Sequence, residues 1–437
     1  MKYDVLVIGG GPAGIGAAFT SAKNGLKTAI VERHSSLGGN WTNGYVLSIL
    51  GVYTYDGSQK IVGGVADEVI ERLKRYNGTN GQVGNFVPFR PEEMKDMLGR
   101  TAKELGIDVY LNTLVSGIEK AESKVMSIIT TGKDGQRRID AKAFIDSSGD
   151  ADTAQLIGLK TMMGMEGNGV HQEATVPFRL ANINEEKVIE YANTHQDVLG
   201  VVLLNNKLTR IRVKDPLVKK AKEEHNLYLP HANSEFLFNT SRKGEFVCNA
   251  THVDISDFTS GKLIAEAMED ARDQVISSVE FLTRNIPGFE NAYLIDSSPY
   301  IGLRETRRAV GEYVLKKSDV MENKRFDDAI ARCGHPIEVH DPDKGVVYQH
   351  LNGGDGSWYH IPYGAIVVRD VDNLFVVGRC LSAEFEAQAS ARVTGTAMAM
   401  GQAAATASLL MIRNSCKAKE VDVKELQKRL SSQGAII

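Results

Sequence analysis

The residues whose types and spacing point most directly to chemistry are glycines close to the N-terminus. Gly9, Gly11 and Gly14 form a G-x-G-x-x-G pattern, with Pro12 and Ala13 between the last two glycines. The first glycine permits a tight turn, the second lets the backbone approach a pyrophosphate, and the third lets a helix pack close to a strand. The pattern therefore predicts a phosphate-binding loop.

The elements that must position this loop can also be predicted. An apolar run at 5–8 predicts a parallel strand buried on both faces. A helix over 12–24 follows, with its N-terminal N–H groups directed at the phosphates. A second apolar strand at 27–31 ends in Glu32, whose carboxylate is placed to accept the ribose hydroxyls of a dinucleotide. A structural glycine turn is the alternative, but the complete strand–turn–helix–strand–acid unit favours dinucleotide binding.

A second pair of glycines bears on which dinucleotide is bound. After the acid, the chain continues through Arg33 to Gly38, Gly39 and Asn40. This ERxxxxGG extension resembles that of the FAD-binding glutathione-reductase-like superfamily, in which the loop passes along the pyrophosphate and the flavin. The resemblance implies that these four residues contact FAD. A surface turn with paired glycines is the alternative.

Two later segments are expected to return to the same cofactor. Short strands are predicted at 108–111, 115–120, 124–131 and 138–145, with a hairpin turn at 133–136. The superfamily resemblance implies that the backbone of Leu114 and Val115 contacts the adenine. The segment that ends in Ser148, Gly149 and Asp150 resembles the superfamily's ATGD motif. The alternative is an ordinary strand exit with a glycine at positive φ.

The C-terminal half carries a broader resemblance. The segments 299–315, 326–342, 358–408 and 423–435, together with the N-terminus, resemble the FAD-dependent oxidoreductase family of bacterial flavoproteins. The wider superfamily commonly has an aspartate after the glycine that ends the strand NLFVVGR, and it binds the ribityl chain. This chain has Arg379 after Gly378. The resemblance therefore implies a rearranged ribityl contact and a place for Arg379 near the pyrophosphate.

A helix rich in small residues is predicted over 394–411. We expect its N-terminus, at Gly395, Thr396 and Ala397, to face the flavin pyrimidine. The helix dipole would then stabilise negative charge on the reduced flavin. A tightly packed buried helix without this role is the alternative.

Arginines and histidines are the candidates for contact with a substrate. Arg304 belongs to a basic cluster with Arg307 and Arg308. Such clusters often form ion pairs, but an arginine fork also suits a carboxylate or phosphate. Arg304 and Arg392, which precedes the small-residue helix, are predicted to line the substrate pocket. His360 is the preferred proton-transfer residue and His171 the second choice, although a single histidine is more often structural. No metal site is predicted, because no His/Cys/Asp cluster has ligand spacing.

The fold class predicted is α/β: a Rossmann-like, glutathione-reductase-like FAD-binding domain with an inserted, mainly β substrate domain. The predicted division is 1–158 and 358–437 for the FAD-binding domain and 159–357 for the insert. A helix over 261–285 should cover the inserted sheet with an apolar face that includes Ile276. The GGDG at 353–356 follows a polar segment and is predicted to be a loop. The absence of a second glycine fingerprint favours an enzyme with one dinucleotide.

The composition argues against several classes of partner and site. The 437 residues carry 51 basic and 55 acidic side chains, a net charge of −4, so neither a nucleic-acid nor a membrane partner is predicted. No apolar stretch long enough to span a membrane is predicted. The four cysteines form no C-x-x-C pair, which argues against a redox disulfide, and a cytoplasmic location is expected.

These features together predict an FAD-dependent oxidoreductase. It would transfer a hydride between flavin N5 and a small organic substrate, anionic if the arginines bind it, and use a separate electron acceptor or donor. A flavoprotein of RNA modification or cofactor biosynthesis is one alternative. A non-catalytic, flavin-bound redox-sensing module is the other. The sequence leaves the oligomeric state open.

Overall fold

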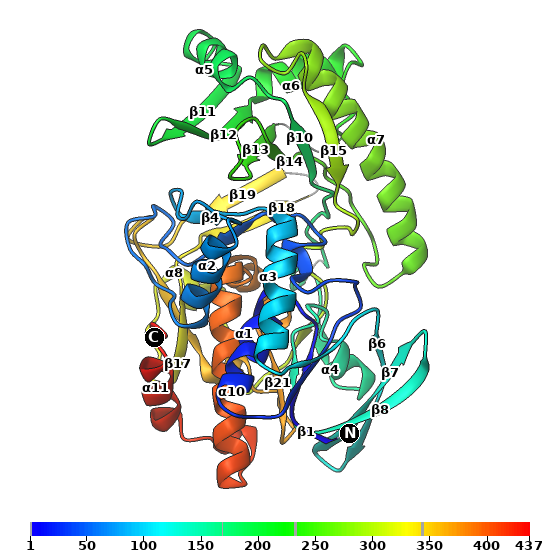
Figure 1. The fold of residues 1–437 in the computed structure, drawn as a ribbon, viewed down its shortest axis with the longest axis vertical. Coiled ribbons are helices and arrows are strands. Elements are labelled where there is room, and N and C mark those ends of the chain that lie inside the picture. Colours follow the sequence, from blue (N-terminus) through cyan, green and yellow to red (C-terminus); the bar gives the residue numbers. More distant parts are fainter. Residues whose placement is uncertain (1, 168, 231–233, 342–344) are drawn as a thin grey trace.

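The computed structural model describes residues 2–167, 169–230, 234–341 and 345–437. Figure 1 shows two parts: an α/β part, at the bottom, that holds both ends of the chain, and a β-rich part, at the top, covered by one long helix. The hairpin of β18 (Ile337–Asp341) and β19 (Gly345–Gln349) lies where the two parts meet.

A seven-stranded sheet forms the centre of the α/β part, in the order β5-β2-β1-β8-β7-β6 with β21 on β8. β1 pairs in parallel with both β2 and β8, and its residues Val5, Leu6 and Val7 are fully buried. This explains the uninterrupted apolar run in the sequence. The strands are β1 (Lys2–Ile8), β2 (Thr28–Val31), β5 (Asp108–Tyr110), β6 (Leu114–Ala121), β7 (Lys124–Gly132), β8 (Gly135–Asp146) and β21 (Leu374–Val376).

Two helices that are far apart in the sequence pack side by side against this sheet: α1 (Pro12–Lys23) and α10 (Thr394–Asn414). At their contact, a Cβ on Gly401 would overlap the carbonyl oxygen of Ala13 and lie 2.8 Å from the nitrogen of Ala17. Small residues therefore bring the two helix backbones together. Both helices begin at the same edge of the sheet, beside the glycine loop.

One expectation about α10 was wrong. Of the helices that the structure describes, it is the one long and apolar enough to cross a membrane, whereas no such stretch was predicted. In the structure, however, 89% of its apolar window is buried inside the protein. The apolar composition therefore reflects close packing in the core.

Shorter elements complete the α/β part. The helices are α2 (Val65–Arg75), α3 (Pro91–Glu104), α4 (Asp152–Leu156), α8 (Lys317–Met321), α9 (Phe385–Ala391) and α11 (Val423–Ser432). Four two-stranded ribbons are β3 (Ser48–Leu50) with β4 (Phe86–Pro88), β9 (Thr161–Met162) with β16 (Arg308–Ala309), β17 (Ala329–Cys333) with β20 (Tyr359–Pro362), and β18 (Ile337–Asp341) with β19 (Gly345–Gln349). The GGDG segment is a loop, as predicted.

The second part is a six-stranded antiparallel sheet in the order β11-β12-β13-β14-β10-β15. Its strands are β10 (Phe178–Ala181), β11 (Leu199–Leu204), β12 (Lys207–Val213), β13 (Glu235–Asn239), β14 (Phe246–Asn249) and β15 (Tyr293–Ser297). Its helices are α5 (Glu185–Thr194), α6 (Asp215–Glu223) and α7 (Gly261–Asn285). The predicted helix over 261–285 is confirmed, but Ile276 is 56% exposed because it lies on the face of α7 turned away from the sheet.

The core of this sheet extends from Ala174 to Leu303, which is shorter than the predicted insert of 159–357. Apolar side chains between 315 and 351, such as Leu315, Ile330 and Leu351, belong to the core of the α/β part. The core of the six-stranded sheet is thus separate from the two cores of the α/β part, and hydrophobic periodicity does not reveal where the chain passes from one part to the other. We call residues 174–303 the cap.

Candidate functional site

The glycine loop between β1 and α1 has the geometry that its sequence predicts. Gly9 adopts φ +92°, and a Cβ there would lie 2.6 Å from the carbonyl oxygen of Ser147. A Cβ on Gly14 would lie 2.7 Å from Ser147 Oγ. Gly11 is different, because the nearest protein atom to its Cβ position is 3.9 Å away. The structure itself therefore requires the first and third glycines, whereas the second leaves space beside Pro12 and Ala13 for a ligand.

Glu32 holds this loop against the end of β2. Its Oε2 accepts a hydrogen bond from the Gly10 nitrogen at 2.6 Å, and its Oε1 accepts one from the His34 nitrogen at 2.8 Å. The carboxylate lies in the wall of the pocket and is 4% exposed. In this structure Glu32 fixes the loop; its contact with a ribose remains a prediction.

The second pair of glycines packs on the first loop. Gly38 donates a backbone hydrogen bond to the carbonyl oxygen of Gly10 at 2.7 Å, and its φ is +115°. A Cβ on Gly39 would lie 2.7 Å from the Cα of Gly11. Gly39 and Asn40 line the pocket, whereas Gly38 lies outside its wall.

The predicted ATGD-like segment is joined to two arginines. The Asp150 carboxylate lies 2.7 Å from Arg379 Nη2 and 3.2 Å from Arg33 Nη1, and it accepts a hydrogen bond from Thr306. Burial by itself would raise the pKa of Asp150, but the charges of Arg379 and Arg33 lower it below its ordinary value. Asp150 thus lies behind the wall and orients the arginines. Both arginines line the pocket, as do Leu114, Val115, Ser148, Gly149 and Gly378.

The N-terminus of α10 reaches the pocket through Thr394 and through Ala397, one of the three residues predicted to face the flavin. Thr394 Oγ1 accepts a hydrogen bond from the Leu50 nitrogen at 3.1 Å. Gly395 packs on Gly51, and Thr396 is fully buried and donates to the carbonyl oxygen of Arg332. Of the three predicted residues, Ala397 lines the pocket, whereas Gly395 and the Thr396 side chain lie outside its wall, because residues three apart, such as Thr394 and Ala397, share one face of a helix. The first-turn N–H groups of α10 still lack intrahelical acceptors.

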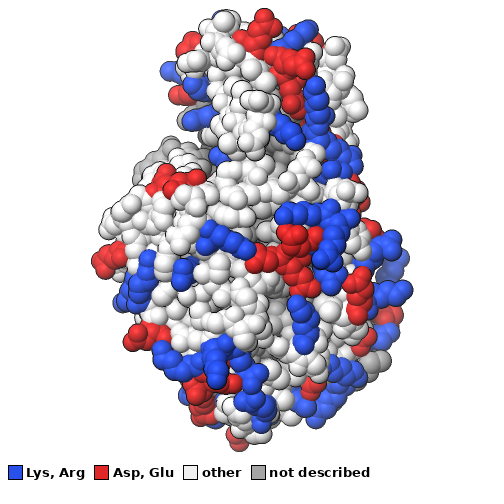
Figure 2. Space-filling view, turned by 60° about the vertical axis from the view of Figure 1, so that its left-hand side comes forward, with Lys and Arg blue, Asp and Glu red and all other residues white. Residues whose placement is uncertain are grey.

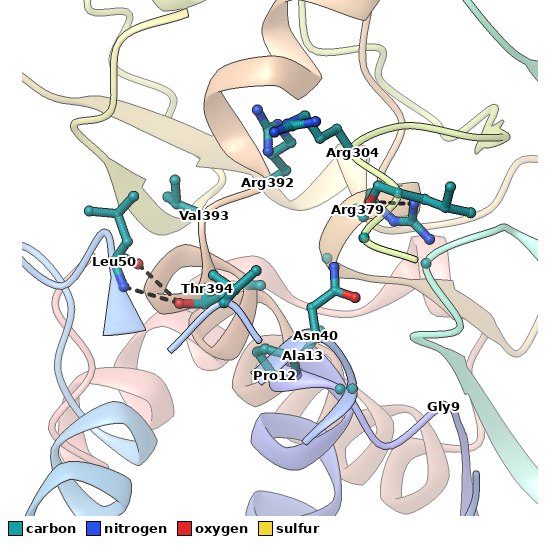
Figure 3. A pocket seen from close by; sticks show the side chains of 18 of the residues that line it. Gly9, Pro12, Ala13, Asn40, Leu50, Arg304, Arg379, Arg392, Val393 and Thr394 are labelled. Atoms are coloured by element: carbon teal, nitrogen blue, oxygen red, sulfur yellow. Dashed lines mark hydrogen bonds between the residues drawn. The ribbon is translucent and has the colours of Figure 1, made fainter. Parts of the chain in front are cut away.

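Two arginines lie across the pocket from the glycine loop. Figure 3 shows the guanidinium groups of Arg304 and Arg392 side by side, opposite Pro12 and Ala13. Arg304 is 7% exposed and donates to the carbonyl oxygen of Glu173 at 2.5 Å. Within the described residues neither arginine forms an ion pair.

Burial and the charge of Arg392 lower the pKa of Arg304 to about 10. Burial likewise lowers the pKa of Arg392. Two adjacent, desolvated cations create a site that favours an anion. Arg307 and Arg308 instead form ion pairs, with Asp152 and with Glu305 and Glu166, so for them the alternative interpretation holds.

The histidines chosen from the sequence lie elsewhere. His360 is outside the pocket wall: its Nδ1 accepts a hydrogen bond from the Phe326 nitrogen, and its ring lies 5.3 Å from that of Trp358. The assignment of His360 to the substrate site was wrong, because β20 pairs with β17 and places this side chain between Arg325 and Arg332. Burial and these arginines lower the pKa of His360 to about 4.

Sequence reasoning missed Glu338 and His340, which do line the pocket. They are two residues apart on β18, so their side chains share one face of the strand. That i, i+2 pair of ionisable residues, alternating with Ile337 and Val339, was the available signal. His171, the second choice, pairs with the buried Glu305 at 3.2 Å. Among the described residues, no group of three His, Cys, Asp or Glu side chains is arranged to hold a metal.

The pocket has a volume of about 400 Å³ and joins these features into one cavity. One end is formed by the glycine loop, the end of β2 and the N-terminus of α10. The other end lies between β18–β19 and the cap and is lined by Tyr55, Phe86, Arg210, Phe238, Asn249, Arg304, His340, Tyr348 and Arg392. The open space at Gly11 and the two helix N-termini suit the pyrophosphate of FAD. The residues present therefore fit this cofactor.

Comparison with known proteins agrees with this geometry. A family model described as FAD dependent oxidoreductase matches residues 4–430. A thiamine thiazole synthase from Methanococcus vannielii is 26% identical over 181 residues, which are 39% of this chain and 65% of that protein. A digeranylgeranylglycerophospholipid reductase from Thermoplasma volcanium is 28% identical over 193 residues, 42% of this chain and 48% of that protein. The chain thus spans less than two thirds of these relatives.

Two solved structures are similar over most of the chain. A p-nitrophenol 4-monooxygenase from Pseudomonas putida DLL-E4 has 12% identity and a TM-score of 0.51, covering 96% of this chain and 82% of that one. The flavin-dependent brominase Bmp2 has 14% identity and a TM-score of 0.51, covering 98% and 83%. At these identities the likeness shows the mixed α/β fold with a parallel sheet. The family model spans nearly the whole chain, and the chain therefore belongs to the FAD-dependent oxidoreductase family, as a flavin enzyme that binds FAD.

Proposed function

We propose that this enzyme transfers a hydride between a small organic anion and N5 of the flavin, and that a separate molecule restores the oxidation state of the flavin. The observation that carries this proposal is the position of Arg304 and Arg392, which lie in the same cavity as the glycine loop. The flavin, when bound, supplies the hydride chemistry. The protein would hold the anion and exclude water.

Each end of the cavity has a distinct role in this proposal. At the glycine loop, the N–H groups of α1 would hold the pyrophosphate, with Arg379 beside Gly149. At the N-terminus of α10, the unpaired N–H groups and the helix dipole would stabilise negative charge on the flavin. At the far end, Arg304 and Arg392 would bind the anionic group of the substrate by charge-assisted hydrogen bonds.

The cap completes the substrate compartment in this proposal. Arg210 of β12 and Phe238 of β13 lie in the wall opposite β18–β19. We propose that the α/β part is of the glutathione-reductase-like type and that the cap is its inserted substrate domain. We also propose a cytoplasmic location, which is supported by the four free cysteines, Cys248, Cys333, Cys380 and Cys416.

The two alternatives make different predictions. The similarity to a thiamine thiazole synthase supports a role in cofactor biosynthesis over the matched segment. A flavoprotein of RNA modification should show salt-dependent RNA binding. On the face drawn in Figure 2, however, basic and acidic side chains are interspersed. A redox-sensing module would bind a partner according to the state of its flavin and show no turnover.

The first test is the visible spectrum of the purified protein, repeated on the supernatant after acid precipitation. Flavin bands in the supernatant indicate non-covalent FAD, and bands retained in the pellet indicate covalent attachment. An anaerobic screen of carboxylates and phosphate esters, followed by flavin bleaching, then identifies substrates. A protein that neither contains nor takes up FAD would refute the proposed function.

The second test replaces the two pocket arginines. Arg304→Ala and Arg392→Ala should each reduce kcat/KM by roughly 10- to 100-fold, the loss expected for a charge-assisted hydrogen bond, while FAD is retained. Arg325→Ala is the matched control, because this arginine stacks on Trp358 outside the pocket. Unchanged turnover in both pocket variants would contradict the proposed anion site.

A further inference from the structure

The substrate end of the pocket contains a buried histidine with one ring nitrogen left without a partner. His340 is 5% exposed and lines the cavity. Its Nε2 lies 2.9 Å from Glu338 Oε1. Its Nδ1 is buried and has no hydrogen-bond partner among the described residues. A buried polar atom of this kind costs stability unless a ligand completes its hydrogen bond.

The neighbours of His340 determine which nitrogen carries the proton. Glu338 is held in its carboxylate form: burial by itself would raise its pKa, but the hydrogen bond from His340 and the charge of Arg392 lower it. A carboxylate only accepts hydrogen bonds, so Nε2 must be the protonated nitrogen. In a neutral ring, Nδ1 then has the free lone pair.

The charge state of the ring follows from the groups that face it. Burial, the charge of Arg304 and that of His252 lower the pKa of His340 to about 3, against the opposite effect of Glu338. The ring is therefore neutral at physiological pH, and Nδ1 is an acceptor. An anion bound to Arg304 would cancel part of the repulsion and raise the pKa of His340, so that anion binding makes Nδ1 a stronger base.

We propose that His340 is the catalytic proton acceptor, which takes the proton of a hydroxyl or amino group on a substrate whose anionic group is held by Arg304 and Arg392. This inference rests on the proposed function and adds a substrate class: an organic anion that carries an O–H or N–H group. Glu338 is the positioning residue that sets the tautomer of His340.

Transfer of the proton from the substrate to His340 requires no further reagent. The O–H or N–H bond of the substrate breaks and its electron pair stays on the heteroatom. The lone pair of Nδ1 forms the new N–H bond, and the resulting imidazolium is stabilised by the Glu338 carboxylate. A weak base suffices, because such a hydroxyl becomes strongly acidic only as its carbon is oxidised.

The test compares two acids that differ only in the hydrogen-bond donor. Mandelate has a hydroxyl beside its carboxylate and phenylacetate has none, and the phenyl ring of both suits the wall formed by Tyr55, Phe86, Phe238 and Tyr348. Isothermal titration of the FAD-loaded protein, with both enantiomers of mandelate, should give a Kd for one enantiomer roughly five- to tenfold below that of phenylacetate, the effect of one hydrogen bond.

Variants at position 340 distinguish the role of Nδ1 from that of Nε2. His340→Gln places its amide near the position of Nε2 and can still donate to Glu338, so it should abolish the preference for mandelate and leave the Kd of phenylacetate unchanged. His340→Asn, with an amide near the position of Nδ1, should keep part of the preference. Equal binding of the two acids by the wild type, or a preference that persists in His340→Gln, overturns the inference. Failure of both acids to bind also overturns it, because the arginines then hold no such anion.

A second measurement uses the wild-type protein, so it does not depend on whether a variant folds. Nitrogen-15 NMR of imidazole-labelled wild type should show one buried histidine as the neutral Nε2–H tautomer between pH 5 and 8. An Nδ1–H tautomer or an imidazolium at pH 7 overturns the inference. For Glu338, the Glu338→Gln variant should change this tautomer signal and the pH profile of flavin reduction, which a purely structural role would not do. The visible spectrum reports FAD binding separately, so failure of the proposed function is distinguishable.

Discussion

The contact between α1 and α10 determines whether the two helix N-termini can reach one cofactor, and it can be tested with a single methyl group. In Gly401→Ala, the new Cβ would overlap the carbonyl oxygen of Ala13 and lie 2.8 Å from the nitrogen of Ala17. Both are backbone atoms inside α1, so no side chain can rotate away. The two helices must separate for the methyl group to fit.

The magnitude follows from two opposing effects. Overpacking of a tight core costs about 1–3 kcal/mol, and backbone contacts place this site at or above the upper end. Replacing a helical glycine with alanine stabilises the folded protein by about 1 kcal/mol through its higher helix propensity. The net destabilisation is then about 2–3 kcal/mol, which for a chain of 437 residues corresponds to a fall in Tm of roughly 2–4 °C. Because the helices carry the glycine loop and Thr394, FAD retention should fall as well.

Thermal unfolding followed by circular dichroism gives Tm, and the fluorescence of released flavin gives the FAD retention. The matched control is Gly99→Ala, in the middle of α3, because no protein atom lies within 4 Å of the Cβ position there. Gly99→Ala should raise Tm by roughly 1 °C and leave FAD retention unchanged, since only the gain of about 1 kcal/mol in helix propensity applies. Equal shifts of the two variants, or an unchanged Tm for Gly401→Ala, would refute the packing explanation.

Three further predictions each concern one ionisable side chain. Burial raises the pKa of Glu235 to about 8, so the folded protein binds a proton that the unfolded chain releases above roughly pH 4.5. Stability should therefore fall as pH rises from 4.5 to 8, and the Tm advantage of Glu235→Gln should grow over that range; a constant advantage would contradict this. Glu32→Ala removes the acceptor of the Gly10 nitrogen and should weaken FAD binding roughly 10- to 100-fold by equilibrium dialysis. His360→Asn should leave kcat, KM and FAD retention unchanged, and a selective loss of kcat would return His360 to the active site.

The sequence by itself determined the parts that local patterns encode. The glycine spacing, the apolar runs on either side and the acid after the second strand specified one β–α–β unit, because each property depends on residues less than forty apart. The hairpin of β7 and β8 and the bounds of α7 followed from local turn chemistry and periodicity. The small residues of α10 also indicated close packing before its partner was known.

Only the tertiary structure decided which side chains meet. A helix or strand pattern states that one face is buried but not which element covers it. For this reason Ile276 was expected inside the cap, and Gly395 and Thr396 were expected to face the pocket. His360 was preferred for proton transfer from its sequence neighbours alone, whereas the pairing of β20 with β17 places it away from the cavity.

The end of the pocket beside the cap is the clearest case in which the sequence does not reveal which side chains meet. Arg304 and Arg392 are 88 residues apart in the sequence, and Glu338 and His340 come from a hairpin between them. Their meeting depends on how the cap packs on the α/β part, which no segment encodes alone. The sequence determined that the chain can hold a dinucleotide. The packing of distant segments decided where Arg304, Arg392 and His340 lie relative to the glycine loop, because burial and charge are properties of the assembled neighbours.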